Sequence, residues 1–210
     1  MLSSIRLPQA IPERPLLVAG VVAGPLYVVV SLIEVAARDG FDPTRHAWSM
    51  LANGSFGWVH ALNLVVSGML VVAGASGLHQ AIGSRAAATL LALYGLGIVG
   101  AGIVAADPGR GFPPGTPEAT PMTWRGGLHF VVGGIGFLGL VAASQLLGRR
   151  LRRAGRPGLA AFSHLTGVAF LALFVAMAAT GGAAWALLGF TGAVLLASAW
   201  LSTIFAHYLQ

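Results

Sequence analysis

The chain contains no cysteine and no lysine, and these two absences exclude several kinds of chemistry. Without cysteine there is no disulfide, no thiolate nucleophile, no iron–sulfur cluster and no covalently attached c-type haem. Without lysine, neither retinal nor pyridoxal phosphate (PLP) can be held as a Schiff base, and no P-loop can form. Any chemistry must therefore come from His, Asp, Glu, Arg, Ser and the backbone.

Charge is also scarce, because 9% of the residues are charged while 56% are apolar and the mean hydropathy is +0.81. This composition is typical of a membrane protein. A helix needs about 20 apolar residues to cross a hydrocarbon core of roughly 30 Å. The segments of this length are 15–37, 57–82, 86–106, 127–148, 159–180 and 184–206. Because backbone groups must be paired within lipid, we predict one all-α domain over residues 1–210, a polytopic membrane protein with six transmembrane helices.

The arginines predict how these helices are oriented. Five of them fall within residues 149–156, Arg6 and Arg14 precede the first apolar segment, and Arg85 follows the second. Basic loops stay cytoplasmic, so we expect both termini to be cytoplasmic and the remaining connections to face outside. This topology, with attraction to anionic lipids, explains the net charge of +6 without nucleic acid as a partner.

The first outer connection is predicted to form a short interfacial helix at about residues 43–53. Asp42 suits its N-cap, Pro43 its first position and Gly54 its end. The polar residues expected on one face of this helix are His46, Ser49 and Asn53. The alternative is a solvated face that only positions the helix at the membrane surface.

The second apolar segment carries a stripe of polar residues, His60, Asn63 and Ser67. Polar side chains at this depth normally face the bundle interior or a wet cavity. Glu34 lies near the outer end of the first segment, where a carboxylate needs either a proton or a cation close by. The alternative is that His60 bonds a neighbouring helix purely for packing.

The third connection adds further polar residues. Asp107 precedes a proline that stops the third helix, and Arg125 and His129 share one face at the start of the fourth. Glycines in these two helices allow close contact, which would bring Asp107 near His129. An ion pair of Asp107 with Arg125 that merely closes the loop is the alternative.

Several short motifs occur in a fixed order along the chain. They are His-Ala-Trp-Ser at 46–49, Gly-Trp at 57–58, Ser-Gly at 67–68, Asp-Pro at 107–108 and Gly-Leu-His at 127–129. In this order the chain resembles a bacterial and archaeal six-helix family called domain of unknown function 998, with a weaker likeness over the last two helices. The resemblance implies six helices, a bacterial plasma membrane and a role for the outer His, Ser and Asp residues, but no particular activity.

A fainter similarity is to the membrane hydrolases that include alkaline ceramidases and adiponectin-receptor-like proteins, which bind zinc. Ser55, His60 and Asp107 stand near the positions of that family's motif, but the His-x3-His pair is missing. With His46 and His129 as substitutes, His46, His60 and His129 would be three zinc ligands, with water as the fourth. A b-type haem between His60 and His129 is another alternative.

The remaining histidines, His79, His164 and His207, lie on the predicted cytoplasmic side. Interfacial placement explains them, although a haem between His79 and His164 is an alternative.

Together these residues favour a membrane enzyme with an outward-facing polar pocket. His60 would act as the base, His129 as the acid or a ligand, and Asp107 as the group that orients them or as a ligand. The rim of the pocket would hold Glu34, His46 and Ser49, and the substrate-binding residues would be Asn53, Asn63, Ser67 and Arg125. The expected substrate is a lipid or isoprenoid-like molecule, which would be hydrolysed, cyclised or isomerised. The alternative is a non-catalytic carrier, sensor or membrane-complex subunit, whose partners are lipids, a second copy or another membrane protein.

Overall fold

The computed structural model describes residues 12–210, which form six long α-helices and one short 3₁₀ helix. The helices are α1 (Glu13–Ala37), η1 (Trp48–Ala52), α2 (Gly57–Ile82), α3 (Arg85–Ile103), α4 (Trp124–Arg153), α5 (Pro157–Ala179) and α6 (Ala184–Leu209). All six α-helices are long and apolar enough to cross a membrane. The prediction of an all-α bundle of six transmembrane helices is confirmed, and the chain is an integral membrane protein.

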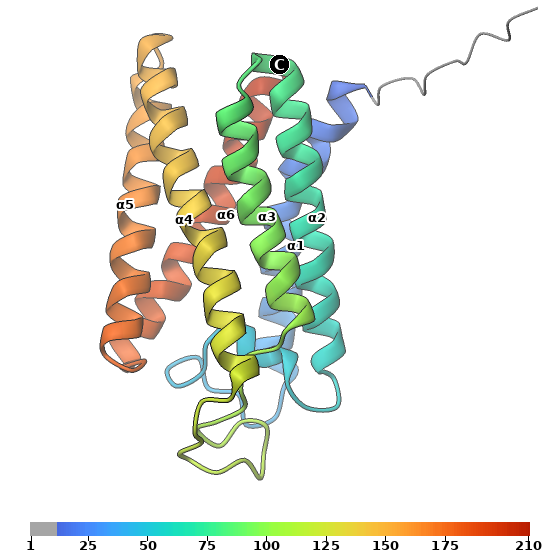
Figure 1. Cartoon of the computed structure of the whole chain (residues 1–210), viewed down its shortest axis with the longest axis vertical. Helices are drawn as coiled ribbons and strands as arrows, with labels where there is room; N and C mark the ends of the chain where they lie inside the picture. Colours follow the sequence, from blue (N-terminus) through green and yellow to red (C-terminus); the bar gives the residue numbers. More distant parts are fainter. Residues whose placement is uncertain (1–11) are drawn as a thin grey trace, which may run out of the picture.

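The helices alternate in direction and form a ring, because each packs against the next and α6 returns to α1 (Figure 1). We call one end of the bundle the loop end. It holds η1 and the connections of residues 38–56, 104–123 and 180–183 (Figure 1). We call the other the arginine end, where α1 starts and α6 finishes. Arg14, Arg85 and the arginines of residues 149–156 lie there, whereas Arg6 lies outside the described residues.

The arginine run is mostly helical rather than a loop, which corrects the predicted end of the fourth helix at residue 148. Helix α4 continues to Arg153, and α5 starts at Pro157 with Arg156 as its N-cap. Arginine is a good helix former, and cations in the last turn are stabilised by the helix dipole. The turn between the two helices is therefore shorter than expected.

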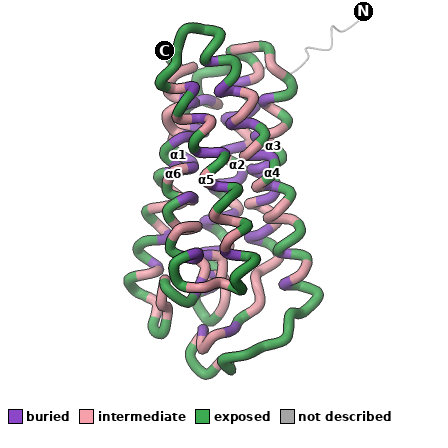
Figure 2. Tube along the Cα trace, turned by 90° about the vertical axis from the view of Figure 1, so that its left-hand side faces the viewer, coloured by how far each residue is buried: buried purple, intermediate pink, exposed green. Residues whose placement is uncertain are grey.

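Burial follows the ring, with buried segments facing its interior and exposed ones on the outer surface (Figure 2). Glycines let the helices approach closely: a Cβ on Gly68 would lie 2.5 Å from the carbonyl oxygen of Gly95, and one on Gly97 2.6 Å from the Cα of Gly136. The predicted close contact between α3 and α4 is confirmed. Large apolar side chains cover the outer faces, as a surface in contact with lipid requires.

The first outer connection differs from its prediction, because only η1 is helical there. The Asp42 carboxylate accepts hydrogen bonds from the backbone N–H and the hydroxyl of Thr44, at 2.8 and 2.7 Å. It thereby closes a local turn instead of capping a helix over residues 43–53. Ala47 is then extended, with ψ at 149°, so His46, Ser49 and Asn53 do not share one helical face.

Candidate functional site

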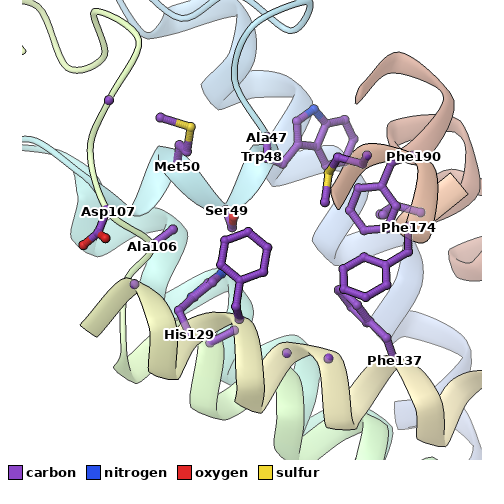
Figure 3. Close-up of a pocket in the computed structure, with 18 of the residues that line it drawn as sticks. Ala47, Trp48, Ser49, Met50, Ala106, Asp107, His129, Phe137, Phe174 and Phe190 are labelled. Carbon is purple, nitrogen blue, oxygen red and sulfur yellow. The ribbon is translucent and has the colours of Figure 1, made fainter. Parts of the chain in front are cut away.

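A cavity of about 550 Å³ lies inside the ring toward the loop end. All six α-helices contribute to its wall, and η1 and residues 106–122 cover it. Its polar lining residues include Ser49, Asp107, Arg110, Glu118, Thr120 and His129. The phenylalanines that contact one another on its apolar side are Phe137, Phe170, Phe174 and Phe190. Figure 3 shows Asp107 on one side, Phe137, Phe174 and Phe190 on the other, and Ser49 and His129 between them. The cavity is therefore amphipathic.

His129 is the histidine on the cavity wall, and its side chain joins two helices. Its Nδ1 lies 2.7 Å from the carbonyl oxygen of Val104, just after the end of α3. A carbonyl can only accept, so Nδ1 carries the hydrogen and donates it. In the neutral ring the lone pair is then on Nε2, which is the nitrogen able to take up a proton.

Asp107 also lines the cavity, but its carboxylate serves the start of α4. It accepts hydrogen bonds from the backbone N–H of Thr123 at 2.7 Å and from the Thr123 hydroxyl at 2.5 Å. Thr123 is the N-cap of α4, and its oxygen in turn accepts from the N–H of Gly126. A Cβ on Gly126 would lie 2.1 Å from the Asp107 carboxylate, so a larger residue there would displace this side chain from Thr123. Asp107 and His129 both line the cavity, but no hydrogen bond joins them in the described structure.

Arg125 does not pair with Asp107. Its guanidinium lies 5.6 Å from the centre of the Trp124 ring, which is a cation–π contact at the loop end. Arg125 is exposed outside the cavity lining, so its predicted role in binding substrate has no support from its position.

Glu34 and His60 form a buried pair between α1 and α2. The Nδ1 of His60 donates to the Glu34 carboxylate at 2.7 Å, and the two residues are 0% and 6% exposed. The Nη1 of Arg38 lies 3.6 Å from the other carboxylate oxygen. Arg38 supplies the cation that a buried carboxylate needs, and its position four residues after Glu34 was the available signal. His60 is outside the cavity lining, so the predicted site of His60, Asp107 and His129 does not converge.

Asn63 and Ser67 belong to the same α1–α2 contact. The Asn63 amide donates to the carbonyl of Tyr27 at 3.1 Å and the Ser31 hydroxyl at 3.3 Å, and Ser67 donates to the Asn63 oxygen at 3.3 Å. Neither Asn63 nor Ser67 lines the cavity. The predicted stripe therefore faces the bundle interior, where its partners are helix α1 rather than a substrate.

His46 and Asn53 connect the loops that cover the cavity. The Nδ1 of His46 accepts from the N–H of Asp42, and its Nε2 donates to the carbonyl of Arg110, both at 2.9 Å. The Asn53 amide donates to the carbonyls of Met50 and Ala106, both at 3.1 Å. His46 thus ties the first outer connection to the third, and Asn53 ties the end of η1 to the third.

The proposed zinc ligands are not gathered. His46 has both ring nitrogens occupied, and His60 donates to Glu34. Over residues 12–210 no three His, Asp or Glu side chains form a group that could hold a metal. The prediction of a zinc site from His46, His60 and His129 is therefore wrong.

Neither proposed haem pair fits its surroundings. His60 is fully buried away from the cavity wall. His164 hydrogen-bonds Gln145 at 2.7 Å, and a Cβ on Gly148 would already lie 2.8 Å from its ring.

Sequence reasoning missed Arg110, which has a positive φ of 54° that non-glycine residues rarely adopt. Its guanidinium donates to the carbonyls of Gly181 and Gly182 and so ties the α5–α6 turn to the cavity cover.

Arg45 and Glu118 form an exposed pair across the same cover, and this contact raises the pKa of the Arg45 guanidinium. Hydrogen bonds from Thr44 lower the pKa of the Asp42 carboxyl.

Comparison with protein families places the chain. The model of the family described as "Protein of unknown function (DUF998)" matches residues 21–207. The chain belongs to the DUF998 family. The match runs from α1 to the last turns of α6, so the cavity and the Glu34–His60 pair both lie within the DUF998 region. No curated protein and no solved structure matches the chain, so the similarity to alkaline ceramidases stays a prediction.

Proposed function

We propose that this DUF998 protein binds an amphiphilic molecule, lipid-like or isoprenoid-like, in the cavity. The observation that carries the proposal is the division of the cavity wall into a polar side and a phenylalanine side. The polar head would lie at the loop end near Ser49 and His129, and the hydrocarbon chain would lie against the phenylalanine rings. Burying apolar surface contributes about 25 cal/mol per Å², while a few polar groups fix the orientation of the ligand.

A second candidate function is catalysis on the bound head group, and one observation favours it. The Nδ1 of His129 is committed to the Val104 carbonyl, which leaves Nε2 as a neutral base on the cavity wall. Such a base suits hydrolysis, cyclisation or isomerisation of the amphiphile. A carrier, sensor or complex subunit would bind the same molecule and release it unchanged.

We also propose that the loop end faces the outside of a bacterial plasma membrane. The arginine end is its counterpart, because positively charged connections stay cytoplasmic. The chain has no native cysteine, so single cysteines at the exposed positions Pro117 and Ala154 report one end each. In intact cells an impermeant maleimide should label Pro117→Cys and spare Ala154→Cys; the reverse pattern would invert the orientation.

Binding can be measured with the protein's own fluorescence, because Trp48 lines the cavity and is 7% exposed. Replacing the exposed Trp58, Trp124 and Trp185 by Phe leaves Trp48 and the core residue Trp200 as reporters. In vesicles of saturated phosphatidylcholine, dibromostearic acid should quench the tryptophan fluorescence of this triple variant, and the quenching should reach saturation. The Trp48→Phe variant should show little quenching. Quenching that rises only in proportion to total bromine, with no saturation, would overturn the proposal.

Replacing His129 by glutamine distinguishes binding from catalysis. Glutamine keeps a side-chain amide that can donate to the Val104 carbonyl but has no basic nitrogen. Prenyl and fatty acyl esters incubated with the reconstituted wild type should yield a product by mass spectrometry, and His129→Gln should bind them without turnover. If the wild type releases every ester unchanged, the carrier or sensor alternative is favoured.

A further inference from the structure

A second, smaller depression lies on the outer surface between α4 and α5. This crevice has a volume of about 200 Å³ and a wholly apolar lining. Its outer lip includes Leu138 and Val175, which are 59% and 54% exposed. The residues that it shares with the cavity are Gly134, Phe137, Phe170 and Phe174. The crevice and the cavity therefore lie on opposite sides of one thin wall, which these four residues form.

The wall consists of phenylalanine rings rather than packed helix backbones. The Phe137 ring lies edge-on to the Phe174 ring, with 5.1 Å between their centres. At Gly133 and Gly134, which line the cavity, an added Cβ would meet nothing within 4 Å. On another face of the same helix, a Cβ on Gly136 would lie 2.9 Å from the Cα of Gly97. Gly136 is thus needed for packing, whereas Gly133 and Gly134 leave space unfilled at a cost in helix stability.

The depth of the crevice indicates what passes through it. Gly134 lies ten residues after the start of α4, which is about 15 Å along the helix. With a hydrocarbon core of roughly 30 Å, this is near the middle of the bilayer. A polar or charged head group at that depth is costly, so the crevice suits a hydrocarbon chain and not a head.

We propose that the α4–α5 crevice is a lateral opening through which the hydrocarbon chain of the bound amphiphile extends into the bilayer. This inference rests on the proposed binding function. The Phe137 and Phe174 rings close the opening when no chain occupies it, and they move apart when one does. The site then recognises the head and the first part of the chain, and it tolerates chains longer than the cavity.

The test compares ligands of different length on a variant with the crevice filled. Leu138→Phe combined with Val175→Phe adds bulk at the outer lip, and neither residue lines the cavity. The matched control is Leu165→Phe with Val168→Phe on α5, two residues that are 62% and 61% exposed and outside both hollows. Dodecanoic and icosanoic acid compete with the brominated acid for the Trp48 reporter in vesicles.

We expect the wild type and the control to bind icosanoic acid at least as tightly as dodecanoic acid. In the variant with the filled crevice, the affinity for icosanoic acid should fall by about tenfold or more, corresponding to about 1.4 kcal/mol. The affinity for dodecanoic acid should be unchanged. Retained binding of dodecanoic acid also shows that the variant is folded. If the double variant binds neither acid, the single Val175→Phe variant is tested against Val168→Phe by the same criterion.

The outcomes separate the two proposals. Equal loss of both acids in Val175→Phe, or unchanged icosanoic acid in the filled variant, overturns the lateral opening and leaves the binding function standing. Failure of the wild type to bind either acid overturns the binding function itself. If filling the crevice instead changes the oligomeric state by size-exclusion chromatography with light scattering, while chain preference is unchanged, the crevice is a contact between copies of the chain.

Discussion

The α1–α2 contact and the α4–α5 contact both join neighbouring helices of the ring, yet different kinds of side chain form them. The first is closed by buried polar groups, with Glu34, His60 and Asn63 bonded across it. The second is closed by phenylalanine rings beside glycines that face open space. In this protein the buried polar residues stabilise the closed side, and the phenylalanine side borders the cavity.

The largest expected effect is on the closed side, at Glu34. Glu34→Ala leaves His60 buried, and Arg38 partly buried, without their carboxylate. Removing one member of a buried ion pair costs about 3–5 kcal/mol, so the free energy of unfolding in mixed SDS micelles should fall by that amount. The control is Glu118→Ala, which removes a carboxylate that is 72% exposed, and it should leave the unfolding midpoint unchanged. Equal losses in the two variants would contradict the assigned importance of burial.

The next effect compares two glycines of α4. Gly136→Ala forces a Cβ to 2.9 Å from the Cα of Gly97, and such overpacking costs about 1–3 kcal/mol. Gly133→Ala meets nothing within 4 Å, so it should gain about 0.5–1 kcal/mol from the better helix propensity of alanine. Thermal denaturation in detergent measures both. Opposite signs are expected, and a shared sign would mean that the two faces of α4 are equally packed.

A smaller effect is expected at the cover of the cavity. Asp107→Ala removes the acceptor for the Thr123 N–H and hydroxyl, and loss of one such capping interaction costs about 1–2 kcal/mol. Hydrogen exchange of the α4 amides should accelerate in the first turn and remain unchanged beyond Gly134. Asp107→Asn keeps one acceptor oxygen and serves as the control with the smaller change. Acceleration along the whole of α4 would show that Asp107 supports more than the start of the helix.

The smallest effect is at Arg45, which pairs with Glu118 on the exposed surface. Exposed ion pairs contribute little and are screened by salt. Arg45→Ala should therefore leave the unfolding midpoint of the reconstituted protein unchanged in high salt and nearly so in low salt. A clear fall in the unfolding midpoint at both salt concentrations would show that this exposed pair stabilises the protein as the Glu34–Arg38 pair does.

Hydropathy was enough to predict the six helices, because the length of an apolar run has one meaning in lipid. The spacing of His60, Asn63 and Ser67 correctly predicted a shared inward stripe. Spacing alone does not tell which neighbour that stripe meets, however, and here it meets α1 and not the cavity. The result is that three predicted site residues belong to packing.

The phenylalanine side of the cavity was not predictable from the sequence, although a polar pocket near Ser49, Asp107 and His129 was. Its phenylalanines come from three different helices and sit in runs that are apolar on every side. No periodicity separates them from residues that face lipid. The prediction that His46 shares a helical face with Ser49 and Asn53 was wrong for a local reason. The turn closed by Asp42 replaces the first part of the helix that this spacing assumed.

Helix α4 is 30 residues long, which is about 45 Å at 1.5 Å per residue, whereas the hydrocarbon core is only about 30 Å thick. Its arginine-bearing turns must therefore stand among the lipid head groups, while Trp124 marks the opposite interface. Guanidinium groups at one boundary and an indole at the other resist vertical sliding of the helix. The arginines would thus set the depth in the bilayer of the proposed opening at Gly134.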